Sequence, residues 1–155
     1  MKKLSSLFAI CLLAVAVFSF NSCKEDPPPP PLLDEELLYG EWNCITSTTY
    51  NVENGFKGGD IVRHNNSLVF TFDANKAFKA IYENDLTKDY AGTWKIKSST
   101  EKVIVFTFTS GAEAESSAEM TANTLTATQL ALERVVEIGN NIQEHTILDF
   151  EKKQQ

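Results

Sequence analysis

The stretch "LLDEELLYGEWNCITSTTY", residues 32–50, decides how the rest of the chain is interpreted. Its first part is acidic, and the sequence Gly40-Glu41-Trp42 follows directly. From Tyr39 onward, the pattern that dominates the chain is an alternation with a period of two residues, which is typical of strands with one buried face. We therefore predict a first β-strand at about residues 41–51.

The same alternation continues to the end of the chain. In "NSLVFTFDANKAFKAIYEN", residues 66–84, two alternating runs flank Asp73-Ala74-Asn75-Lys76, and Asp and Asn favour turns, so this segment predicts a hairpin. Further turns are predicted at Ser110-Gly111, near Asn123 and at Gly139-Asn140-Asn141. The predicted strands are residues 41–51, 68–72, 78–82, 90–97, 102–109, 112–121, 125–138 and 142–152.

Residues 129–138, "QLALERVVEI", also fit a helix, because Leu130, Glu133 and Glu137 have helical spacing. Val135-Val136 and the adjacent turn favour a strand. Eight antiparallel strands, each with one apolar face, close into a barrel or fold into a sandwich, because open sheet edges promote aggregation. The alternation alone does not distinguish between these two architectures.

The opening stretch resembles the lipocalin family, in which a short helical turn, here residues 34–39, leads into Gly-x-Trp, here Gly40 to Trp42. The chain after its N-terminal segment is similar to lipocalin-like lipoproteins of Gram-negative bacteria, with a second Gly-x-Trp at residues 92–94. The resemblance implies an all-β fold, an eight-stranded antiparallel up-and-down barrel after a short helical turn. The alternative is that both tryptophans anchor the core of another β fold.

The resemblance also assigns a structure to the base of the barrel. Trp42 is expected to plug the closed end, near the end of the last strand and Phe150. Family members often place a basic side chain across this tryptophan, and Lys152 has the right phase and position, with Arg134 as the alternative. Gly40, Trp42, Phe150 and Lys152 are therefore the predicted structural residues of the base.

The N-terminus reads as an export signal. Lys2 and Lys3 precede an apolar run that is too short for a membrane span, which needs about 20 residues, and that stops near Ser22-Cys23. This boundary resembles a bacterial lipobox, so residues 1–22 are predicted to be a signal peptide and Cys23 to carry lipid. The alternative is a secreted protein that is cleaved elsewhere and keeps a free thiol at Cys23.

The segment after the lipobox predicts how the domain is displayed. Residues 23–33 combine Lys-Glu-Asp with five prolines, which favour a stiff, extended spacer. The three charged residues resemble signals for the outer face of the outer membrane. The predicted organisation is a signal peptide at 1–22, a lipidated tether at 23–33 and a lipocalin-like domain at 34–155. The domain is expected to be anchored in the outer membrane through Cys23, with display at the cell surface as the location that the charged residues suggest.

Composition and motifs exclude several functions. Removing Lys2 and Lys3 with the signal peptide changes the net charge from −7 to −9, and only two arginines are present, which argues against nucleic-acid binding. Cys44 is the one cysteine left for the folded domain and is expected to be buried. Motifs for catalysis, metal ions and cofactors were sought without success, with His64 expected in a solvated loop and Glu133 on a solvated wall. We predict no enzymatic activity, no cofactor and no metal.

The inward faces predict a lumen that holds a small apolar or amphipathic molecule. Bulky rings fill much of it, but small residues on the first and third strands leave room near the open end. The predicted ligand-binding residues are Thr46, Thr48, Phe70, Ala80, Tyr82 and Tyr90. The alternative function is a surface-exposed module with a filled barrel, which binds a protein or glycan through a loop at residues 50–66. With either function, the barrel is expected to be monomeric.

Overall fold

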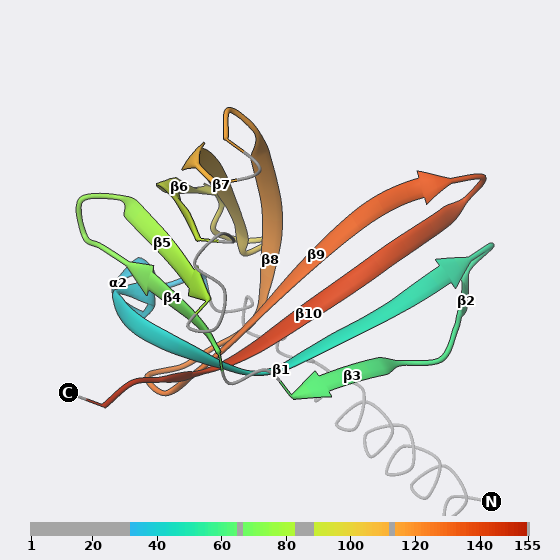
Figure 1. Cartoon of the computed structure of the whole chain (residues 1–155), viewed down its shortest axis with the longest axis horizontal. Helices are drawn as coiled ribbons and strands as arrows, with labels where there is room; N and C mark the ends of the chain where they lie inside the picture. Colours follow the sequence, from blue (N-terminus) through green and yellow to red (C-terminus); the bar gives the residue numbers. More distant parts are fainter. Residues whose placement is uncertain (1–31, 65–66, 83–88, 112–113, 155) are drawn as a thin grey trace, which may run out of the picture. The chain divides into compact units, whose positions relative to one another are not determined.

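The computed structural model describes residues 32–64, 67–82, 89–111 and 114–154. The predicted signal peptide, Cys23 and nearly all of the tether lie outside these residues. Within the described residues, one short helix precedes a single antiparallel β-sheet (Figure 1). The elements are α2 (Glu35–Leu38), β1 (Gly40–Glu53), β2 (Phe56–Lys57), β3 (Ile61–His64), β4 (Leu68–Phe72), β5 (Ala77–Tyr82), β6 (Tyr90–Ser98), β7 (Val103–Ser110), β8 (Ser117–Leu125), β9 (Gln129–Gly139) and β10 (Ile142–Lys152).

The sheet closes on itself as an eight-stranded barrel of β1 and β4–β10. Each strand from β4 to β10 pairs with the next, and β10 pairs with β1 from Trp42 opposite Lys152 to Glu53 opposite Ile142. Closure removes the open edges that an eight-stranded sheet would otherwise expose. The predicted up-and-down barrel is confirmed, and the strand assignment of residues 129–138 is confirmed over the helical alternative.

The long strand β1 pairs with three strands in succession on the edge opposite β10. Its first residues, Gly40 to Asn43, pair with β4, residues 46–49 pair with β3, and Val52 and Glu53 pair with β2. Residues 50–66 were expected to be a loop, and this prediction is wrong for β2 and β3. These short strands give the upper part of β1 a hydrogen-bonded neighbour at a height that β4 does not reach (Figure 1).

The turns follow local side-chain chemistry, with one correction. Lys76 and the pair Asn140-Asn141 have positive φ at the predicted turns. The turn near Asn123 is wrong, because Asn123 lies inside β8 and the chain reverses after Thr126. The Thr126 hydroxyl accepts hydrogen bonds from the backbone of Thr128 and Gln129, so threonine does here what Asn or Asp usually does.

The start of β8 also differs from the prediction. The strand begins at Ser117 and not at residue 112, and residues 114 and 115 form part of a turn in which Glu115 has a φ of 69°. Residues 112 and 113 lie outside the described residues.

Candidate functional site

The base of the barrel is a closed, fully packed plug. Trp42 is completely buried, and its indole Nε1 donates a hydrogen bond of 2.7 Å to the carbonyl oxygen of Leu38 in α2. The Lys152 ammonium lies 4.9 Å from the centroid of the Trp42 ring and donates a 3.0 Å hydrogen bond to the carbonyl oxygen of Leu37. The structure thus places Lys152, and not Arg134, across the tryptophan.

Gly40 and Phe150 complete this base. Gly40 has a φ of +116°, which glycine adopts without strain, and a Cβ at this position would meet Cε of Lys152 at 3.2 Å. Phe150 is buried opposite Cys44 in the β1–β10 register. Rings from several strands pack with Phe150 in tilted and edge-to-face contacts, namely Phe70, Phe72, Phe78, Trp94 and Phe106.

Above this packed layer lies a cavity of about 640 Å³. One wall is apolar and comes from β4–β7, with Leu68, Phe70, Ala80, Tyr82, Tyr90 and Phe108. The facing wall, here called the polar wall, comes from β1, β3, β9 and β10 and carries most of the polar lining, alongside the apolar residues Val136 and Leu148. Its polar residues are Ser47, Thr49, Arg63, Arg134, Glu144 and Thr146. A volume of this size is within the range of small-molecule sites in proteins.

Four of the six predicted ligand-binding residues line this cavity: Phe70, Ala80, Tyr82 and Tyr90. Thr46 and Thr48 do not, and this part of the prediction is corrected. The register of β1 against β10 shifts between Cys44 and Thr46, so that Ile45 forms a β-bulge. A bulge inserts one residue and reverses the alternation beyond it. Ser47 and Thr49 therefore face the cavity.

The side chains of Thr46 and Thr48 lie on the outer face. The Thr46 hydroxyl donates a 2.8 Å hydrogen bond to Oδ2 of Asp149, and Thr48 pairs with Val62, an exposed residue of β3. Nothing in the local sequence of residues 42–49 distinguishes a bulged strand from a regular one. The cavity residues Ser47 and Thr49 were missed for that reason.

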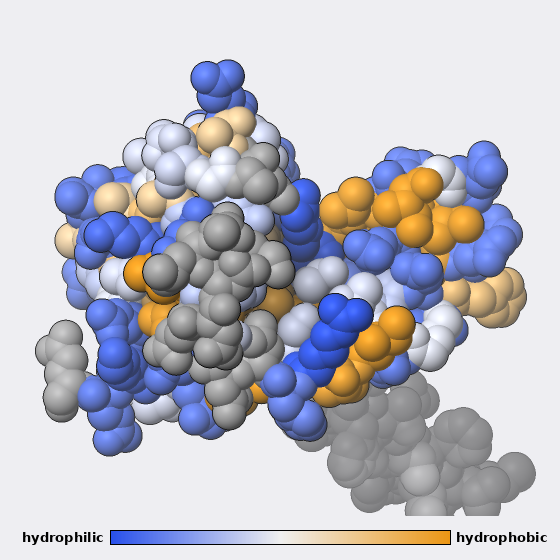
Figure 2. All heavy atoms as spheres, in the orientation of Figure 1, coloured by the Kyte–Doolittle hydropathy of each residue, from blue (hydrophilic) through white to orange (hydrophobic). Residues whose placement is uncertain are grey.

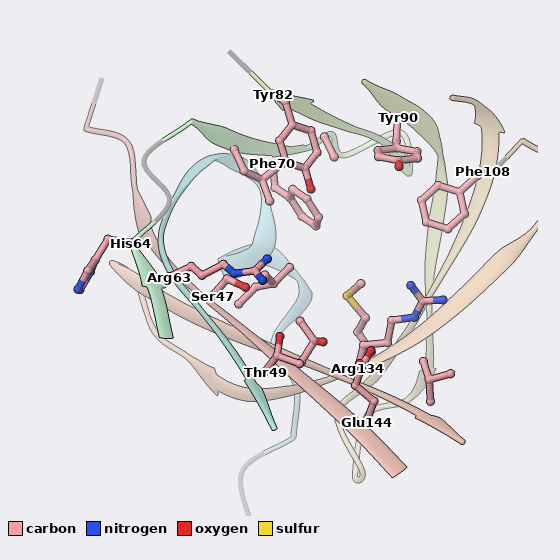
Figure 3. A pocket seen from close by; sticks show the side chains of 16 residues that line it. Ser47, Thr49, Arg63, His64, Phe70, Tyr82, Tyr90, Phe108, Arg134 and Glu144 are labelled. Atoms are coloured by element: carbon pink, nitrogen blue, oxygen red, sulfur yellow. The ribbon is translucent and has the colours of Figure 1, made fainter. Parts of the chain in front are cut away.

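Charged side chains gather on the polar wall. Figure 3 shows Arg63 and Arg134 extending toward the cavity from two sides, with Ser47 and Thr49 between them. Glu144 comes from β10, next to Arg134, and His64 contributes to the rim with its ring turned away from the cavity. These arginines were counted from the sequence but were not assigned to the lumen.

A second polar cluster lies on the outer wall, around Glu133. Its Oε1 is 2.7 Å from Nδ1 of His145, its Oε2 accepts a 2.7 Å hydrogen bond from Asn123, and the ring of Tyr50 stacks on His145. The predicted solvated position of Glu133 is therefore wrong, since only 18 % of its side chain is exposed. Burial raises the pKa of Glu133, but the contacts with Asn123, His145 and Tyr50 outweigh it and lower the pKa overall.

Cys44 is a buried free thiol, as predicted. It has no exposed surface, and burial, followed by the nearby carboxylate of Asp149, raises its pKa to about 11. A thiol with such a pKa is protonated at neutral pH and is a poor nucleophile. Cys44 therefore acts as a small apolar residue between the base and the bulge.

Within residues 32–64, 67–82, 89–111 and 114–154, no three His, Cys, Asp or Glu side chains are grouped so as to hold a metal ion. Among the same residues, no helix has the length and apolar composition that a membrane span requires.

The comparison with known proteins agrees with the architecture. A family model described as a lipocalin-like domain matches residues 38–132, from the end of α2 to β9. The chain belongs to the lipocalin-like domain family. A search of curated proteins found no match. The match covers the base tryptophan and most of the cavity wall, so the lipocalin-like domain is the part of the chain in which a binding function is expected.

Proposed function

We propose that this protein is a lipid-anchored, non-enzymatic binding protein that holds a small apolar or amphipathic molecule in its barrel. The observation that supports this most directly is the cavity of about 640 Å³ above a sealed base. Closed packing at Trp42 and open space at Tyr82 and Tyr90 give a site that is sealed at the base, with aromatic rings on one wall and hydroxyl groups on the other. Such a site suits binding, because rings and hydroxyls hold and orient a molecule.

The anchor in this proposal is the lipid on Cys23. Its support is the sequence, in which an apolar run ends at Ser22-Cys23 before the proline spacer. One acyl chain holds a protein to a membrane only marginally, whereas two or more give a stable anchor. We further propose that the protein is anchored at the outer membrane, with the tether as a spacer and the barrel exposed at the cell surface.

Cys23→Ala tests the anchor. The unchanged protein is expected in the membrane fraction and to incorporate a clickable fatty acid, because Cys23 is the proposed lipid acceptor. The variant should be unlabelled and either soluble or unprocessed. Fatty-acid labelling of the variant would show that the lipobox assignment is wrong.

Binding is tested with N-phenylnaphthylamine, an uncharged dye whose fluorescence rises in apolar surroundings. Residues 23–155 with Cys23→Ala provide the predicted mature chain without its lipid. Saturable binding at one site, with quenching of tryptophan fluorescence, is expected. Ala80→Trp should weaken this binding by filling the apolar wall, whereas Lys79→Trp, on the outer face of the same strand, should not. Absence of saturable binding would remove the proposed function.

A surface interaction module is the second candidate function. Figure 2 shows apolar surface over the ends of the strands beyond the barrel, and the exposed residues there include Phe56, Ile61, Val62, Val135 and Ile138. Phe56 alone has 79 % of its surface exposed. This function is supported if the unlipidated chain binds no dye and forms a complex with a protein or glycan partner. If Phe56→Ser abolishes that complex, this function replaces the first.

A further inference from the structure

The two walls of the cavity differ in chemistry, and the difference points to a class of ligand. The apolar wall offers the rings of Phe70, Tyr82, Tyr90 and Phe108, while the facing wall offers hydroxyls and guanidinium groups (Figure 3). A purely apolar ligand would leave the polar wall without partners, which costs free energy once water is displaced. The cavity is therefore matched to a molecule that has an apolar body and a polar group.

Charge indicates the sign of that polar group. The chain has a net charge of −7 and contains two arginines, and both line this one cavity. Among the described lining residues, the two guanidinium groups face a single carboxylate, that of Glu144. The polar wall is thus positive inside an acidic protein, which favours an anion over a cation.

Guanidinium groups also provide the right geometry for an oxyanion. Each presents five N–H donors in a planar fork that fits a carboxylate, sulfonate or phosphate. Arg134 already makes an interaction within the protein. An anion at this wall would therefore share Arg134 with that partner. Ser47 and Thr49, between the two arginines, add hydroxyl donors.

We propose that the cavity selects amphipathic organic anions, whose carboxylate or sulfonate binds Arg63 and Arg134 while the apolar body packs against Phe70, Tyr82 and Tyr90. This inference rests on the proposed binding function and specifies its ligand class. It predicts that the affinity for an anion depends on the arginines, while the affinity for a neutral molecule of the same shape does not.

The test compares two dyes that differ by one charged group: anilinonaphthalene sulfonate and its uncharged parent, N-phenylnaphthylamine. Both are titrated by fluorescence against residues 23–155 with Cys23→Ala, at low and high salt. The unchanged cavity should bind the sulfonate more tightly than the neutral dye, and salt should reduce this difference.

The variants are Arg63→Gln, Arg134→Gln and the two combined, with Lys79→Gln as a matched loss of one positive charge on the exposed outer face of β5. Each arginine variant should weaken sulfonate binding by about fivefold to tenfold, as expected for a partly exposed charge-assisted hydrogen bond. The affinity of each variant for the neutral dye should stay within about twofold of that of the unchanged protein, a difference well below 1 kcal/mol. Lys79→Gln should leave both affinities unchanged.

Each outcome separates the two proposals. Selective loss of sulfonate binding in the arginine variants supports the anion site. Equal binding of both dyes that is insensitive to the arginines overturns the anion inference and leaves the binding function in place. Loss of both dyes in the variants, with unchanged thermal unfolding, shows that the arginines only shape the cavity and also overturns the inference. Binding of neither dye to the unchanged protein overturns both proposals.

Discussion

The lower and upper halves of this barrel are built from the same strands and differ in how their interiors are filled. In the lower half, Trp42, Phe72, Phe106 and Phe150 have at most 1 % of their surface exposed. In the upper half, Tyr82 and Tyr90 are only partly buried and face a cavity. An eight-stranded barrel is just wide enough for its own side chains to fill. The size of the inward residues therefore decides where space remains.

Strand β1 shows this change in size along its length. Its inward positions are Trp42, Cys44, Ser47 and Thr49, so one large ring at the base is followed by three small side chains toward the open end. The rings on the facing strands then have no partner of matching bulk across the lumen. The comparison teaches that stability is concentrated in the base and binding capacity in the upper half.

The largest expected effect is at the base. Trp42→Ala removes a fully buried indole and its hydrogen bond to Leu38, and it should lower the free energy of unfolding by about 3–5 kcal/mol. Tyr82→Ala, in the upper half, should cost about 1 kcal/mol because its ring is only partly buried. Urea denaturation followed by circular dichroism measures both. Equal costs for the two variants would contradict the division between base and cavity.

A smaller effect is expected at Gly92, where β6 approaches β7 closely. A Cβ there would overlap the carbonyl oxygen of Thr107 and meet Cε1 of Phe78 at 2.9 Å. Gly92→Ala should therefore destabilise the protein by about 1–3 kcal/mol, as overpacking of a core usually does. Gly59→Ala is the control, because a Cβ there meets no atom within 4 Å. Thermal unfolding compares the two, and an unaffected Gly92→Ala would mean that the two strands are less tightly packed.

The bulge at Ile45 is tested by paired substitutions in the upper half. Ser47→Phe should fill part of the cavity and weaken N-phenylnaphthylamine binding by about tenfold, roughly 1.4 kcal/mol. Thr48→Phe, one residue further along and on the outer face, should leave binding unchanged. The reverse result would mean that the strand continues without a bulge and that the upper lumen is lined by Thr46 and Thr48.

The smallest effect is expected outside the cavity, at Glu133. Its folded-state pKa lies below its ordinary value of 4.5, so its ionised form stabilises the fold above that pH, and this contribution is lost as the pH falls through the lowered folded-state value. Glu133→Gln should cost about 1 kcal/mol at pH 7 and progressively less below about pH 4.

The control for this pH dependence is Glu137→Gln, an exposed carboxylate on the same face of β9. It should change stability little at any pH, since exposed charges contribute little. Urea denaturation at a series of pH values measures both variants. A cost for Glu133→Gln that does not vary with pH would show that charge is unimportant in the outer cluster.

The sequence by itself indicated the barrel strands, and its resemblance to the lipocalin family supplied the closed barrel and its base. Alternation of apolar residues is a local property, and it predicted the eight barrel strands because each must bury one face. The turn at Gly139-Asn140-Asn141 and the burial of Trp42 were also predictable from the residue types. Glycine and asparagine favour turns, and a large aromatic ring favours burial. Four of the six residues predicted for the lumen were placed correctly from their positions in the two-residue alternation of their strands.

The tertiary structure decided the remaining features, because they depend on pairing between distant segments. The bulge at Ile45 arises where β1 meets β10, more than a hundred positions later in the chain, and it exchanges the faces of Thr46 and Ser47. The contact between Glu133 and His145 joins neighbouring strands in a register that alternation does not fix. The presence of Arg63 and Arg134 in one cavity has the same origin, since closure pairs β1 with β10 and so brings β3 and β9 to the same wall of the lumen.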